Sequence, residues 1–77
     1  MRIHVKLQLT FEDRAPAGRN PFDLELTPGA TVARALEALA IPVSTPKVIM
    51  VNGRAATPDR KLAPGDELTV FPPIEGG

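Results

Sequence analysis

An alternation of apolar and polar residues near the start of the chain is the strongest constraint on its fold. Apolar side chains occupy every second position: Ile3, Val5, Leu7, Leu9 and Phe11. Successive side chains of a strand point to opposite faces of a sheet, so this period of two predicts a strand with one buried face. The fold should therefore contain a sheet that is covered on one side only.

The next segments predict a second strand and one helix. Residues 12–21 form a connecting loop, and residues 22–26 alternate again, which predicts a strand that pairs with the first as a hairpin. Thr31 is a candidate N-cap for a helix of about ten residues, which we expect Pro42 to end. One face of this helix is apolar, with Val32, Ala35, Leu36 and Leu39.

The last third of the chain predicts three more strands. Residues 47–51 and 54–57 flank Asn52-Gly53, a pair that favours a two-residue hairpin turn because both residues tolerate positive φ. Residues 67–71 form the final strand, which ends at two prolines that cannot donate ladder hydrogen bonds. With only one helix, this order predicts an α+β fold, in which a mixed sheet packs on a single helix in one domain over residues 1–77.

Composition excludes several classes of function. The 77 residues carry nine basic and nine acidic side chains without blocks of one sign, which gives no electrostatic case for nucleic acid or for an anionic membrane surface. No apolar run approaches the ~20 residues of a membrane span, and the charged start lacks the apolar core of a signal peptide. We therefore expect a cytoplasmic protein whose partners are proteins or small molecules.

Metal and acid–base sites are also disfavoured. The chain has no cysteine and a single histidine, His4, which lacks the company of ligands that a structural zinc site needs and is expected to point outward from the first strand. Asp66 and Glu67 are adjacent strand residues that point to opposite faces, and Gly65-Asp66 is explained as part of a turn. We predict neither a metal site nor a catalytic acid–base pair.

The end of the chain is the strongest candidate for function. Gly76 and Gly77 follow the stiff Phe71-Pro72-Pro73-Ile74 stretch. Glycines have no Cβ, so they can pass through a channel too narrow for other residues and leave an unhindered carboxylate at the end. The alternative interpretation is a frayed polar terminus without a role.

A patch for partners is predicted beside this tail. If Ile49, Val51, Leu68 and Val70 face the helix, pleating places other apolar side chains on the opposite face of the sheet. Those side chains are Val48, Met50 and Phe71, and they are followed by Pro72, Pro73 and Ile74. We expect these residues to bind partners, although a shift of one residue in register would exchange the two faces.

Together, these motifs resemble the MoaD/ThiS family of β-grasp (ubiquitin-like) sulfur carriers. The resemblance covers nearly the whole chain and is most specific in Val51-Asn52-Gly53, in residues 62–68 and in residues 71–77. Phe-Pro-Pro before Gly-Gly is most similar to the small subunit of molybdopterin synthase.

The resemblance implies a role for the last residues. In that family a ubiquitin-activating-type enzyme adenylates the terminal glycine carboxylate, which is then converted to a thiocarboxylate; here that residue would be Gly77, with Gly76 and Glu75 threaded into the partner. The implied partners are an activating adenylyltransferase that uses ATP, a sulfur donor protein and a sulfur-acceptor enzyme such as the large molybdopterin synthase subunit. The chain itself would be a carrier that binds no cofactor.

Other functions remain open. Thiamine synthesis, tungsten cofactor synthesis and tRNA thiolation use similar carriers, so the resemblance does not select one pathway. A ubiquitin-like modifier would use the same activated Gly77 to form an isopeptide bond with lysines of target proteins. A β-grasp interaction module with an inert tail is the third alternative, and it would keep its activity without Gly76 and Gly77.

Overall fold

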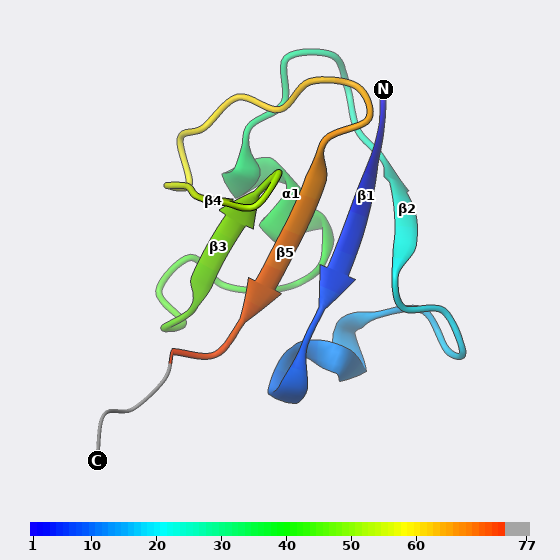
Figure 1. Cartoon of the computed structure of the whole chain (residues 1–77), viewed down its shortest axis with the longest axis vertical. Coiled ribbons are helices and arrows are strands. Elements are labelled where there is room, and N and C mark those ends of the chain that lie inside the picture. Colours follow the sequence, from blue (N-terminus) through cyan, green and yellow to red (C-terminus); the bar gives the residue numbers. More distant parts are fainter. Residues whose placement is uncertain (74–77) are drawn as a thin grey trace.

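The computed structural model describes residues 1–73, which form a five-stranded mixed sheet packed on one α-helix (Figure 1). The strands lie in the order β2-β1-β5-β3-β4; β1 and β5 are parallel, and the other neighbours are antiparallel. The predicted α+β layer is thereby confirmed. The elements along the chain are β1 (Arg2–Leu7), the 3-10 helix η1 (Leu9–Arg14), β2 (Phe22–Glu25), α1 (Val32–Ala38), β3 (Val48–Val51), β4 (Arg54–Ala55) and β5 (Glu67–Phe71).

The core lies between the inner face of the sheet and α1. Strands β1 and β5 and the helix contribute most of the fully buried side chains, and every large side chain in the core is apolar. The main contributors are Ile3, Val5 and Leu7 of β1, Leu68 and Val70 of β5, and Val32, Ala35 and Leu36 of α1. Burial of these side chains stabilises the domain by roughly 25 cal/mol per Å² of apolar surface removed from water.

The first strand is shorter than the alternation predicted. The pattern extends to Phe11, but β1 ends at Leu7 and Leu9 adopts a left-handed φ of 54°. The chain then turns into η1, which returns Phe11 to the core and leaves Leu9 exposed. The alternation therefore predicted the burial of side chains in a strand correctly only as far as Leu7. Phe11 is also buried, but it belongs to the 3-10 helix η1 and not to the strand. The side chain of Asn20 bonds both backbone groups of Leu7, at 3.0 and 2.6 Å, where β1 leaves the sheet.

The helix begins as predicted and ends earlier. The Oγ1 of Thr31 accepts a hydrogen bond from Arg34 N at 3.4 Å, which confirms the N-cap. The helix ends at Ala38 rather than at Pro42, because Ala40 adopts a φ of 58° and reverses the chain. Ile41 N donates to Leu36 O at 2.9 Å, and Ala40 N to Glu37 O at 3.0 Å, the two bonds of a Schellman motif.

The remaining strands match the predictions with shorter bounds. Asn52 and Gly53 have φ values of 53° and 80°, as the predicted hairpin turn requires. β2 ends at Glu25, β3 begins at Val48, and the return strand β4 contains only Arg54–Ala55. The final strand has the predicted bounds of 67–71. Within the described residues, no helix has the length and apolar character needed to cross a membrane.

Candidate functional site

The predicted division of β3 and β5 into two faces is correct. Ile49, Val51, Leu68 and Val70 are buried towards α1. Their neighbours lie on the outer face of the sheet, where they are half-buried: Val48, Met50 and Phe71. We call these three residues the apolar patch; they face solvent because no element of the described chain covers them.

The register of the two strands brings the patch together. Val48 lies directly opposite Phe71, and Met50 lies opposite Thr69 in the antiparallel β3–β5 pair. Directly opposed residues have Cβ atoms about 4.5–5.5 Å apart, and diagonal neighbours remain within reach of long side chains. The methionine can adapt its shape to a partner, and the phenylalanine supplies a rigid apolar surface.

The chain leaves the sheet at the end of this patch. Pro72 is half-buried, and Pro73 is exposed; we call this pair the tail root. Proline fixes φ, so the tail root leaves the sheet in a restricted direction. The other predicted tail residues, Ile74, Glu75, Gly76 and Gly77, lie outside the described residues.

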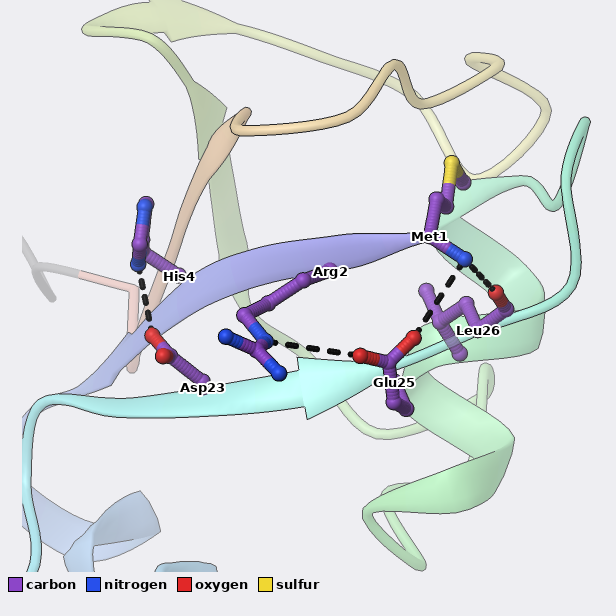
Figure 2. A network of polar contacts seen from close by, with 6 residues as sticks. All are labelled: Met1, Arg2, His4, Asp23, Glu25 and Leu26. Atoms are coloured by element: carbon purple, nitrogen blue, oxygen red, sulfur yellow. Dashed lines mark hydrogen bonds and ion pairs between the residues drawn. The ribbon is translucent and has the colours of Figure 1, made fainter.

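The outer face of β1 and β2 is charged instead of apolar. His4 Nδ1 lies 2.6 Å from Asp23 Oδ1, and Arg2 Nε lies 3.4 Å from Glu25 Oε1; both contacts are drawn in Figure 2. The predicted outward orientation of His4 is therefore confirmed. Exposed pairs of this kind contribute only about 0–1 kcal/mol each to stability. His4 and Asp23, together with Glu67, line a shallow hollow beside the apolar patch.

The N-terminal amine also contacts the β2 edge of the sheet. It donates to Leu26 O at 2.5 Å and lies 3.4 Å from Glu25 Oε2 (Figure 2). These contacts hold Met1 against the chain that follows β2 and extend the β1–β2 pairing by one residue.

Asp66 and Asn52 hold the start of β5 in register. Asp66 accepts hydrogen bonds from Ala63 N at 2.8 Å and from Asn52 Nδ2 at 3.0 Å. The side-chain oxygen of Asn52 in turn accepts from Glu67 N at 2.9 Å. The backbone bond from Ala63, followed by the Asn52 bond, lowers the pKa of Asp66 below its ordinary value. The predicted turn role of Asp66 is correct, and the turn fixes the strand that leads to the tail root.

Sequence reasoning missed the role of Lys47, which it placed in a strand. Its Nζ donates to the carbonyl oxygens of Pro42, Val43 and Thr45, at 3.1, 3.0 and 2.5 Å. Desolvation by burial lowers the pKa of this amine. Lys47 therefore closes the loop between α1 and β3. Only a weak indication of this role is present in the sequence, namely a single lysine directly after a segment that contains Pro42 and Pro46.

Among residues 1–73, the His, Asp and Glu side chains form no group of three that could hold a metal ion. The features that lie together are the apolar patch and the tail root, because Phe71 belongs to the patch and is followed directly by Pro72.

Comparisons with known proteins agree with this geometry. The ThiS family model matches residues 12–77. The crystal structure of SAMP1 from Haloferax volcanii is 28% identical with a TM-score of 0.78, and each chain is covered over 100% of its length. A Pyrococcus furiosus protein, provisionally named molybdopterin converting factor, subunit 1, is 28% identical with a TM-score of 0.76; the match covers 95% of this chain and 98% of that one.

A more distant structure shares the fold alone. A ubiquitin-like protein from Caldiarchaeum subterraneum is 24% identical with a TM-score of 0.54, over 99% of this chain and 100% of that one. No curated protein matches the chain. The family model covers most of the sequence, and the solved structures share the β-grasp arrangement of one helix on a mixed sheet. The chain therefore belongs to the ThiS family of small, ubiquitin-like sulfur carriers.

Proposed function

We propose that the Gly77 carboxylate is the group that carries sulfur. One observation carries the proposal: the chain ends in Gly-Gly after a tail root that leaves the sheet beside an apolar patch. A protein that delivers its own terminus to another active site needs both features, a narrow end that can enter and a surface that can dock. Membership of the ThiS family supports the same conclusion.

The chemistry requires activation by a partner. A C-terminal carboxylate has a pKa near 3.5 and is ionised at pH 7, so it resists attack by nucleophiles. In the proposed reaction a carboxylate oxygen of Gly77 attacks the α-phosphorus of ATP on an activating adenylyltransferase, and pyrophosphate leaves. Sulfur at the oxidation level of sulfide, delivered by a donor protein, then attacks the carbonyl carbon, and AMP leaves. The carrier contributes the reacting atom and binds no cofactor of its own.

Molybdopterin synthesis is the pathway we propose for this sulfur. The Phe-Pro-Pro stretch before the diglycine and the similarity to the Pyrococcus furiosus protein both support it. The acceptor would then be the large molybdopterin synthase subunit. Thiamine synthesis, tungsten cofactor synthesis and tRNA thiolation would use the same activated terminus with a different acceptor enzyme.

A protein modifier is the second candidate, because SAMP1 is a small archaeal modifier protein. In this version a lysine amine of a target attacks the activated Gly77 carbonyl and forms an isopeptide bond. Both versions need activation first, and they differ in the nucleophile that attacks the activated carbonyl: sulfide in the carrier and a lysine amine in the modifier. Mass spectrometry of products from a cell extract separates them: a thiocarboxylate supports the carrier, and an attached target peptide supports the modifier.

The variant Gly76→Val tests the proposed use of the tail. A β-branched side chain narrows the allowed backbone angles and widens the segment that must enter the activating enzyme. We expect pyrophosphate exchange by the activating adenylyltransferase to be abolished while the melting temperature stays unchanged. Ala17→Val, in the exposed loop before β2, is the matched control and should exchange normally. Normal exchange by Gly76→Val would refute the threading of the tail.

A further inference from the structure

The position of β5 decides which segments surround the tail root. β5 lies between β1, which is parallel to it, and β3, which is antiparallel to it. The end of β5 therefore lies beside the segment that follows β1 and the segment that precedes β3. Figure 1 shows both at the end of the sheet where the chain leaves β5.

The segment after β1 carries an exposed leucine. Gln8 N donates to Val70 O at 3.0 Å, and Leu9 follows directly, so Leu9 lies one strand away from the tail root. Its side chain is 70% exposed. Its φ of 54° is a left-handed conformation that disfavours leucine and that asparagine or glycine adopts more readily. The turn into η1 accounts for the φ, but it does not account for an exposed leucine at a position that asparagine or glycine would fit better.

The segment before β3 carries an exposed valine. Val43 is 58% exposed, and with Leu9 it makes up the exposed large apolar side chains of residues 1–73. Its carbonyl oxygen is held by Lys47 Nζ, and Lys47 directly precedes Val48, the partner of Phe71. The lysine therefore fixes the loop in a shape that keeps Val43 outside the core at the same end of the sheet.

We propose that Leu9 and Val43 are the two sides of a docking collar around the tail root, and that the collar binds apolar side chains at the mouth of the activating adenylyltransferase. The proposal rests on the proposed function. Four residues follow Pro73 and span at most about 14 Å, so any site that receives the carboxylate of Gly77 opens close to this end of the sheet. We assign the activating enzyme because carrier and modifier both need it.

The test compares variants that remove the apolar side chains without disturbing the backbone. Leu9→Asn suits a left-handed φ, and Val43→Thr keeps the shape of valine. Leu9→Met retains an apolar side chain and is the conservative control, and Ala38→Ser changes an exposed position on α1. The measurement is ATP–pyrophosphate exchange by the cognate activating enzyme at several concentrations of each carrier, together with thermal melts.

We expect the KM for the Leu9→Asn/Val43→Thr carrier to rise by about tenfold or more, because removing a leucine and a valine side chain from contact with the enzyme loses enough apolar burial for a change of that size. The kcat should change little, the melting temperature should not fall, and Leu9→Met and Ala38→Ser should behave as the natural sequence.

Three results would overturn the collar. If the KM of the double variant is unchanged while the natural sequence exchanges normally, the docking collar is refuted and the proposed function is unaffected. An unchanged KM with slower sulfur transfer to the acceptor assigns Leu9 and Val43 to that enzyme instead. If the natural sequence gives no exchange with an enzyme that is shown to activate another ThiS-family carrier, both the proposed function and the docking collar are refuted.

Discussion

At the scale of single residues, the Asp66 carboxylate connects the turn before β5 to the β3–β4 hairpin. It accepts one hydrogen bond from the backbone of Ala63 and one from the side chain of Asn52. These bonds lower its pKa, so the ionised form is favoured in the folded protein. Because β5 ends at the tail root, this turn also determines where the tail root begins.

Asp66→Asn should therefore change the response of the protein to acid. The pKa of Asp66 is lower in the folded protein than its ordinary value of 3.8, so the unfolded chain takes up the proton first as the pH falls. The contribution of Asp66 is complete above about pH 3.8 and is lost as the pH falls through the lower folded pKa. Urea denaturation should show that the natural sequence is more stable by about 1 kcal/mol at pH 7 and that this advantage shrinks below pH 3.8. A constant difference between the two proteins across this range would contradict the assignment.

At the scale of elements, α1 ends without a glycine. Ala40 occupies the left-handed position of the Schellman motif, where glycine is the usual residue. The buried Ile41 and Leu36 meet across the motif and hold the chain in this turn. The packing of Ile41 therefore offsets an unfavourable backbone conformation at its neighbour.

Ala40→Gly should stabilise the protein, because glycine adopts a φ of 58° without the penalty of a Cβ. We expect the free energy of unfolding to rise by up to about 1 kcal/mol in chemical denaturation. Ala38→Gly, at the last helical residue, is the matched control and should lower it by about 1 kcal/mol. Equal losses for both variants would show that Ala40 is not under strain.

The two faces of β3 provide a second test. Met50→Asp adds a charge to the outer face and should leave cooperative unfolding intact while raising the KM for the activating or acceptor enzyme. Ile49→Asp, one residue away, places an unpaired charge in the core and should prevent folding, since its penalty is comparable with the total stability of a small domain. Circular dichroism and exchange kinetics distinguish the two. Loss of folding in Met50→Asp would mean that the outer face supports the fold.

The sequence predicted features that depend on short-range chemistry. The N-cap at Thr31 and the turn at Asn52-Gly53 follow from the residues themselves. The faces of β3 and β5 follow from alternation because burial alternates along both strands, with every second side chain in the core that packs on α1. Alternation alone was thus enough to place Phe71 and Met50 on the outer face of the sheet.

Other features depend on the folded environment and could not be predicted. The alternation continues in the sequence to Phe11, but the chain turns at Leu9, and nothing local marks a left-handed leucine. The left-handed turn at Ala40, after the end of α1, is stabilised by the packing of Ile41, and the loop before β3 is held by three carbonyl contacts of Lys47. The outer face of the strands beside the tail root was therefore predictable from the sequence, and the conformations of the two loops beside it were not.

At the scale of the whole molecule, the tail begins at the end of the central strand. β5 is hydrogen-bonded to β1 on one side and to β3 on the other, so the strand from which the tail starts is held by both neighbours (Figure 1). The apolar patch, the tail root and the two exposed residues Leu9 and Val43 lie around this point. This arrangement suits a carrier that docks through its folded domain and presents only its last residues for chemistry.

The intact mass of the protein tests the central claim most directly. The protein is incubated with its activating adenylyltransferase, ATP and a sulfur donor, and a variant that lacks Gly76 and Gly77 serves as the control. We predict that the mass of the natural sequence changes by the exchange of one oxygen for one sulfur, that fragmentation assigns the change to Gly77, and that the truncated variant does not change. An unchanged mass, with an enzyme and a donor that load another ThiS-family carrier, would contradict this claim.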